Sequence, residues 1–192
     1  LEAWFSHVPG LKVVCPATVQ DAYALTSAAI RDPDPVILVE NKALYAMKGE
    51  LPDDIPDATI GEALILREGQ DVTLVSYGAA VFTCLKAAEA MANEGISVEV
   101  IDLRTLQPWD KATVSASLEK THRAIVVHEA VRSYGAGAEI AATIGEICFD
   151  ELDAPVGRVG APFMPVPYAP SLEKVYIPDS HDVIQAIYSA LE

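Results

Sequence analysis

The sequence predicts an α/β protein whose main part, residues 71–192, is a three-layer α/β/α domain with a mostly parallel sheet. Residues 72–75 form a short apolar, β-branched run, which is typical of a strand buried on both faces. Residues 79–94 are rich in strong helix formers with apolar side chains at helical spacing, and Gly95 provides a left-handed end. A second strand is expected at residues 98–103. This strand–helix–strand order predicts a right-handed crossover unit.

The rest of this domain continues the alternation of strands and helices. The expected elements are a helix capped by Asp110, a strand at 124–127, a loop at 130–137, a helix carrying Ile140, Ile144, Ile147 and Cys148, a strand at 156–159 and a last helix capped by Asp179 or Ser180. Residues 160–178 are rich in proline and are expected to cross the surface. Many chemistries share this architecture, so function has to be sought in particular sites.

Residues 1–48 hold a second, smaller α/β pattern. A strand at 11–14, a helix that begins after Thr18 and a strand at 36–39 make one β-α-β unit. Alone, such a unit leaves its helix and sheet faces in water, below the size at which a core is stable. We therefore expect it to be the tail of a larger domain, or to need a partner that covers it.

Residues 49–70 are predicted to link the two parts. Glycine and proline interrupt regular structure there, and acidic residues, Asp53 and Asp54 among them, keep the segment in water. Residues 62–67 predict an edge strand at its end. The predicted division is residues 1–48, a linker at 49–70 and the domain at 71–192.

Composition narrows the classes of partner. The formal net charge of −15 argues against a nucleic-acid or anionic-membrane surface and favours basic proteins or small molecules. No apolar run approaches the roughly 18 residues of a membrane helix. The three cysteines are widely spaced without a Cys-x-x-Cys pair, so we expect buried core thiols in a reducing, cytoplasmic compartment.

Ligands of open parallel sheets collect outside the carboxyl ends of the strands, and four segments meet that condition. They are Ser76-Tyr77-Gly78, Asp102 to Asp110, His128-Glu129, and Tyr134 to Glu139. For the first segment we favour a simple turn over a ligand site. For Asp102 and Arg104 we favour ion pairs with neighbouring loops over a catalytic role. His128 could serve as an acid, a base or an anion ligand, and a structural histidine is an equal alternative. A phosphate-binding G-x-G-x-x-G motif needs a third glycine after Gly135 and Gly137, but Ile140 stands at that position. Close packing of the helix therefore explains the glycines of the fourth segment better than a phosphate-binding turn.

A separate candidate lies in the smaller unit. Residues 29–35 (AIRDPDP) place free carbonyls at the negative end of a helix next to the carboxylates of Asp32 and Asp34. Such oxygens suit a hard cation. A solvated acidic turn ended by proline is the simpler alternative, and the residues alone favour it.

Several ordered stretches carry a family resemblance. They are FSHVPGLKVV at residues 5–14, VEVIDLRTLQPWD at 98–110, VHEA at 127–130, GAGAEI at 135–140, APVGRV at 154–159 and YIP at 176–178. In this order they resemble the beta subunits of thiamine-diphosphate-dependent 2-oxo acid dehydrogenases, over essentially the whole chain. The resemblance implies that residues 1–48 are the end of a pyrimidine-binding domain and the rest a transketolase-type carboxy-terminal domain.

The resemblance also implies an activity and partners. Such subunits join an alpha subunit in an α2β2 assembly with thiamine diphosphate at the interface, decarboxylate a 2-oxo acid and pass the acyl group to lipoamide on a lipoyl acyltransferase core. This portion would serve the beta–beta contact and docking, in the cytoplasm or, in a eukaryote, the mitochondrial matrix. The substrate, whether pyruvate, another 2-oxo acid or acetoin, is left open.

The resemblance assigns no catalytic or cofactor-binding residue to this chain, because the family's catalytic histidine and cofactor-binding glutamate precede Leu1. The family's potassium loop falls on Ala29, Ile30, Asp32 and Asp34, where Asp34 replaces a common asparagine and one further ligand lies upstream. Two other functions stay open: a non-catalytic docking module, and a nucleotide-binding domain that uses Gly135 and Gly137.

Overall fold

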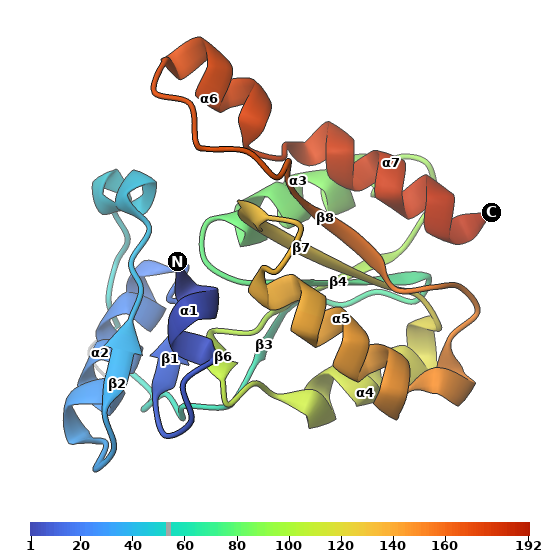
Figure 1. The fold of residues 1–192 in the computed structure, drawn as a ribbon. Coiled ribbons are helices and arrows are strands. Elements are labelled where there is room, and N and C mark those ends of the chain that lie inside the picture. Colours follow the sequence, from blue (N-terminus) through green and yellow to red (C-terminus); the bar gives the residue numbers. More distant parts are fainter. Residues whose placement is uncertain (53–54) are drawn as a thin grey trace.

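The computed structural model describes residues 1–52 and 55–192, so Asp53 and Asp54 of the predicted linker lie outside the described residues. The chain forms a three-stranded sheet beside a five-stranded sheet that has helices on both faces (Figure 1). The helices are α1 (Glu2–Ser6), α2 (Val19–Arg31), α3 (Ala80–Ala92), α4 (Lys111–Thr121), α5 (Ala136–Ile147), α6 (Pro170–Tyr176) and α7 (Ser180–Leu191), with 3-10 helices η1 (Lys42–Ala46) and η2 (Phe149–Glu151). The strands are β1 (Lys12–Val14), β2 (Val36–Leu38), β3 (Leu64–Arg67), β4 (Val72–Ser76), β5 (Val98–Asp102), β6 (Thr105–Gln107), β7 (Ala124–Val131) and β8 (Gly157–Ala161).

The larger sheet confirms the predicted fold class. Its order is β3-β5-β4-β7-β8, in which β5, β4, β7 and β8 run parallel and β3 is an antiparallel edge. Helices α4 and α5 cover one face, and α3 and α7 cover the other, which gives three layers (Figure 1). The edge strand predicted at residues 62–67 is β3.

The core follows from the alternation of side chains along buried strands. Every residue of β4 is buried. Val75 packs in the cluster that includes α4 and α5, whereas Val72 and Leu74 pack in the cluster that includes α3 and α7. The central strand therefore has no solvent face, which explains its continuous apolar run.

The helix ends confirm the predicted caps. The side chains of Thr18, Asp110 and Asp179 each accept a hydrogen bond from a backbone N–H in the first turn that follows. Gly95 has a φ of 80°, the left-handed conformation expected after α3. All three cysteines are buried free thiols, as predicted.

The smaller sheet contains a strand that the sequence did not indicate. Strands β1 and β2 are parallel, as predicted for residues 11–14 and 36–39, but β6 adds to β1 in antiparallel register. The segment 105–107 lies inside the range predicted for the larger domain. A three-residue strand whose partner is far away in the sequence carries no local signal, so pattern analysis could not find it.

The segment predicted to cross the surface at residues 160–178 is mostly exposed, but it contains helix α6, which was not predicted. Pro170 is the first residue of α6, a position where its missing N–H costs nothing. Strand β7 also continues into the predicted loop at 130–137, because Val131 pairs with Ala161 of β8. Helix α1 and η1 were likewise not predicted.

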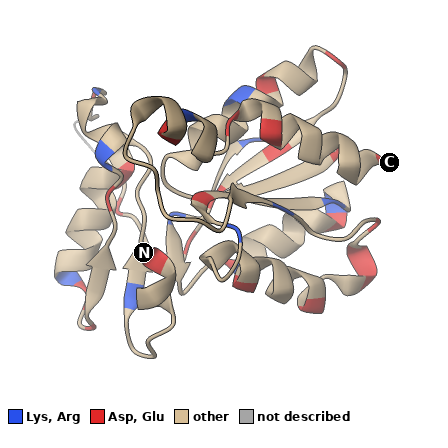
Figure 2. Cartoon of the chain, turned by 45° about the horizontal axis from the view of Figure 1, so that its top comes forward, with Lys and Arg blue, Asp and Glu red and all other residues tan. Residues whose placement is uncertain are grey.

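Charge is distributed without a single basic face on the part of the chain that is described. Lys and Arg positions are scattered among the more numerous Asp and Glu positions (Figure 2). Among the described helices, none has both the length and the apolar character needed to cross a membrane.

Candidate functional site

A cavity of about 270 Å³ lies where the two sheets meet, beyond the carboxyl end of β4 and beside the last residues of β7. Its lining comes from both parts of the chain: Leu1, Glu2, Cys15, Val39, Glu40, Asn41, Tyr77, Gly78, Ala79, Glu129 and Ala130. Two predicted positions, Tyr77-Gly78 and Glu129, therefore share one site. Residues 39–41, which follow β2, were not singled out from the sequence, and only the fold brings them here.

The polar groups of this cavity are mainly carboxylates. The Tyr77 hydroxyl donates to Glu2 Oε1 at 2.7 Å, and Asn41 Nδ2 donates to Glu129 Oε2. Burial raises the pKa of Glu129, although the hydrogen bond from Asn41 acts in the opposite direction. A lining of this kind suits a cation or a hydrogen-bond donor and opposes phosphate groups.

His128 lies beneath this cavity and is only 1% exposed. Its ring stacks on Tyr77 with centroids 6.1 Å apart, and neither ring nitrogen has a hydrogen-bond partner among the residues that the structure describes. Burial lowers its pKa, so the ring is neutral near pH 7. A neutral ring that contacts neither solvent nor a partner cannot exchange protons readily, which favours the structural interpretation of this histidine.

Three glycines make room for the His128 ring. A Cβ added at Gly137 would lie 2.3 Å from Cδ2 of the ring, and one added at Gly135 or Gly160 would lie 3.0 Å from Cε1. Gly135, which caps α5, and Gly137, in its first turn, thus serve packing, as the sequence suggested. Gly160, in β8, was missed because it lies far from this segment in the sequence.

Replacing Gly137 by alanine is therefore expected to lower the free energy of unfolding. Overpacking against the ring costs about 1–3 kcal/mol, and the better helix propensity of alanine returns about 1 kcal/mol. Gly145→Ala, in the same helix, is the matched control, because a Cβ added there meets nothing within 4 Å. Urea denaturation should show loss at Gly137 and none at Gly145. Equal stability of the two variants would contradict this packing role.

Arg104 forms the ion pair that the sequence suggested, but with a helix and not with a loop. Its Nη2 lies 2.8 Å from Asp21 Oδ1, in the first turn of α2. Asp102 accepts a hydrogen bond from the backbone N–H of Arg104 at 2.9 Å. Asp21 and Asp102 are buried and Arg104 is mostly buried, and none of the three lines the cavity.

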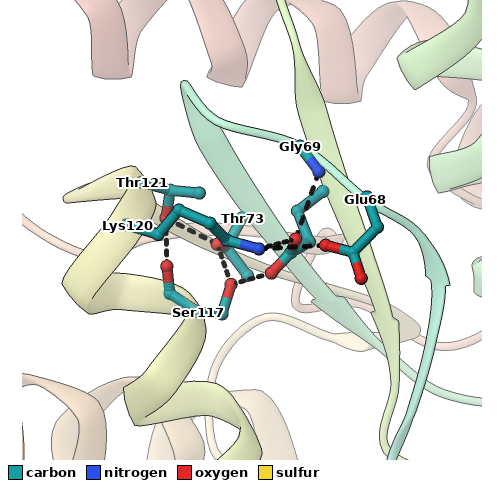
Figure 3. A network of polar contacts seen from close by, with 7 residues as sticks. Glu68, Gly69, Thr73, Ser117, Lys120 and Thr121 are labelled. Carbon is teal, nitrogen blue, oxygen red and sulfur yellow. Dashed lines mark hydrogen bonds and ion pairs between the residues drawn. The ribbon is translucent and has the colours of Figure 1, made fainter.

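A buried polar network, missed in the sequence, connects β5 to α4 (Figure 3). Glu99 is fully buried, and its carboxylate accepts hydrogen bonds from Lys120 Nζ at 2.5 Å, Gly69 N at 3.1 Å and Ser117 Oγ. Burial opposes ionisation, but these hydrogen bonds lower the pKa of Glu99. A glutamate inside a strand expected to be buried on both faces was the available signal.

The predicted cation position is partly occupied by a side chain. Lys12 Nζ lies 2.7 Å from Asp32 Oδ1 and 3.0 Å from Asp34 Oδ2. The hydrogen bonds from Lys12 lower the pKa of Asp32. Ala29 and Ile30 belong to the last turn of α2, whose carbonyls lack partners within the helix. Among the described residues, no group of three or more His, Cys, Asp or Glu side chains is placed to hold a metal ion.

Comparison with known proteins assigns the fold to a family. Residues 61–183 match the family described as transketolase, C-terminal domain, and residues 1–48 match transketolase, pyrimidine binding domain. The chain belongs to the transketolase C-terminal domain family. This confirms the resemblance and accounts for the five-stranded, mostly parallel sheet.

Two relatives and one solved structure show which proteins this chain is similar to. The chain is 46% identical over 188 residues to pyruvate dehydrogenase E1 component subunit beta-1, mitochondrial, of Arabidopsis thaliana, covering 96% of this chain and 52% of that protein. It is 45% identical over 182 residues to acetoin:2,6-dichlorophenolindophenol oxidoreductase subunit beta of Cupriavidus necator, covering 95% and 54%. A solved structure of a split gene transketolase, described as an inactive beta4 tetramer, superposes with a TM-score of 0.81 at 25% identity, covering 99% of this chain and 60% of that one. The chain spans about half the length of the curated relatives it matches.

Proposed function

We propose that this chain is part of the beta subunit of a 2-oxo acid dehydrogenase. In the α2β2 assembly this enzyme would decarboxylate a 2-oxo acid and transfer the acyl group to lipoamide. The observation that carries the proposal is the 46% identity, over 96% of this chain, to a protein named as a pyruvate dehydrogenase E1 beta subunit. Residues 1–48 would be the end of the pyrimidine-binding domain, 49–70 a linker and 71–192 the carboxy-terminal domain.

The residues of this chain do not by themselves fit thiamine diphosphate, which would supply the decarboxylation chemistry when bound by the full assembly. The cavity between the sheets is lined by the carboxylates of Glu2, Glu40 and Glu129, which repel a diphosphate. The buried His128 is not available as a proton donor or acceptor. These observations support the assignment of no catalytic or cofactor-binding residue to this portion.

Exposed apolar side chains support an assembly role. Trp4, Ile30 and Tyr45 of the smaller unit are 74%, 79% and 67% exposed. They lie on three elements, α1, α2 and η1, and large exposed apolar side chains are typical of positions that another chain covers. We infer contacts of this unit with the alpha subunit, and further contacts of the chain with a second beta subunit and a lipoyl acyltransferase core. The location would be the cytoplasm of a bacterium or the mitochondrial matrix of a eukaryote.

Reconstitution tests this function. The beta subunit that contains this chain is expected to co-purify with its alpha subunit and to decarboxylate a 2-oxo acid only in that assembly, with thiamine diphosphate added. This chain alone is expected to show no turnover. Turnover by this chain alone would contradict the proposal. An assembly without activity, together with binding to an acyltransferase core in the absence of any alpha subunit, would also contradict it and would identify a docking module.

An acetoin dehydrogenase is the second candidate, because the 45% identical relative from Cupriavidus necator is named for acetoin. The same reconstituted assembly distinguishes the two. Comparing kcat/KM for pyruvate, branched-chain 2-oxo acids and acetoin assigns the substrate. Preference for acetoin by tenfold or more would replace the 2-oxo acid assignment.

We further propose that the end of α2 binds a monovalent cation, potassium in the first instance, through Ala29, Ile30, Asp32 and Asp34. The last-turn carbonyls and the negative end of the helix favour a cation there. Lys12 already neutralises part of the carboxylate charge, so we expect weak binding. Potassium chloride should raise the Tm of the assembly above that in choline chloride at equal ionic strength. A shift that persists unchanged in Asp32→Asn, with exposed Asp150→Asn as control, would contradict this site.

A further inference from the structure

The chain crosses from one sheet to the other within two residues. Strand β5 of the larger sheet ends at Asp102, and β6 of the smaller sheet begins at Thr105. Arg104, in the crossing, has a φ of 60°, which is unfavourable for a residue with a side chain. Its carbonyl accepts a hydrogen bond from the backbone N–H of Cys15 at 2.8 Å. This crossing, residues 102–105, is the joint between the two sheets.

One arginine contacts two buried carboxyl groups at this joint, one through its guanidinium and one through its backbone N–H. Arg104 Nη2 binds Asp21 Oδ1 at 2.8 Å, and Asp21 is 5% exposed. Asp102 is fully buried and contacts Arg104 through the backbone N–H, at 2.9 Å from Oδ1. Asp102 Oδ2 and Arg104 Nε have no hydrogen-bond partner among residues 1–52 and 55–192. If both carboxyl groups are ionised, the joint holds two negative charges against one positive charge.

Within the part of the chain that the structure describes, no second cation pairs with Asp102. Its partners on the adjacent strands are Leu64 and Ser76, which carry no charge. The titratable groups that interact with it are Asp21 from α2, Arg104 in the crossing, Cys15 after β1 and Cys84 from α3. Burial raises the pKa of Asp102 to about 7; the backbone hydrogen bond from Arg104 opposes this shift, and the charge of Asp21 adds to it.

We propose that Asp102 is a proton-dependent latch, which holds the two sheets together in its neutral form and loosens the joint when it ionises. The neutral carboxyl leaves Arg104 and Asp21 as a balanced buried pair. The ionised carboxylate adds a charge that the joint does not compensate, and the cost is relieved by opening to water. This inference concerns the contact between the sheets and does not depend on the assignment to a 2-oxo acid dehydrogenase.

The sign follows from proton linkage. The closed joint holds the proton up to a pKa of about 7, whereas an aspartic acid in water loses it near 3.9. The closed form therefore binds more protons than the open form, and its stability falls as the pH rises. Between pH 6 and 8.5, linkage with these two values predicts that the opening equilibrium increases about tenfold.

Amide hydrogen exchange of the beta subunit in its assembly measures this opening. After correction for the intrinsic pH dependence of exchange, the amides of Cys15 and β6 should open about tenfold more at pH 8.5 than at pH 6, while those of β4 change little. Asp102→Asn should remove this dependence, and Asp150→Asn, an exposed control, should keep it. An unchanged joint in the wild type, or the same dependence in Asp102→Asn, would overturn the latch.

A second measurement does not depend on how the variant folds. The carboxyl carbon of Asp102 can be titrated by NMR in the wild-type protein labelled with ¹³C-aspartate. A midpoint near 7 is expected. A midpoint below 5 would show that Asp102 is ionised throughout the range and would overturn the proposal.

Discussion

Replacing Lys120 by methionine is expected to lower the free energy of unfolding by about 3 kcal/mol. Lys120 is the only cation bonded to Glu99 among the described residues, and the Glu99 side chain is fully buried. Removing one partner of such a pair leaves an uncompensated buried charge, which typically costs about 3–5 kcal/mol. The lower end applies here because the Lys120 side chain is 29% exposed and water can approach it.

The control for this change is Lys86→Met, on the exposed side of α3, where the lysine makes no hydrogen bond or ion pair with the described residues. The double variant Lys120→Met/Glu99→Gln should recover part of the loss, because a neutral amide needs no counter-charge. Urea denaturation at pH 7 measures the free energy of unfolding of the wild type and of these three variants. If Lys120→Met is no less stable than Lys86→Met, the buried ion pair does not stabilise the fold.

Replacing Gly69 by alanine is expected to cost about 3 kcal/mol or more. A Cβ at this position would lie 2.1 Å from the backbone nitrogen of Glu99 and 2.3 Å from the carbonyl carbon of Val98. These are backbone atoms of a buried strand and cannot rotate away, so the turn between β3 and β4 must move. That movement also weakens the hydrogen bond from Gly69 N to Glu99 Oε2.

The measurement is again chemical denaturation, with Gly145→Ala as the control that adds a Cβ into open space. Hydrogen exchange adds a local readout, because displacement of the turn should expose the amides of β3 and the start of β5. Unchanged stability of Gly69→Ala would mean that the turn is not held against β5 as the structure places it.

The elements that the sequence predicted are those whose signals are local. Strand β4 was visible because all its residues are buried and apolar or β-branched, and the starts of α2 and α4 were visible through the caps Thr18 and Asp110. Strand β6 was not, because its three residues gain their strand geometry from β1 and not from their own pattern. Helix α6 was missed because prolines occur both in surface loops and in the first turn of helices, so they did not distinguish the two.

The candidate site, too, could be predicted from the sequence only where the signals are local. The sequence located Tyr77 because the carboxyl end of β4 can be placed from the strand pattern, and it singled out Glu129 although β7 continues to Val131. It did not show that Asn41 of the smaller unit reaches Glu129, or that Asp21 reaches Arg104, because both contacts depend on how the two sheets meet. The cation residues Ala29, Ile30, Asp32 and Asp34 stay a prediction.

The pairing of β6 with β1 has a consequence during protein synthesis. Residues 12–14 leave the ribosome long before residues 105–107, so the smaller sheet lacks an edge strand while the larger one is being made. An unpaired strand edge on a nascent chain is a site for wrong association. Closing a contact over such a distance is also slow. We therefore expect the first unit to require chaperone protection until translation has passed Gln107, and deletion of β6 to direct it into aggregates.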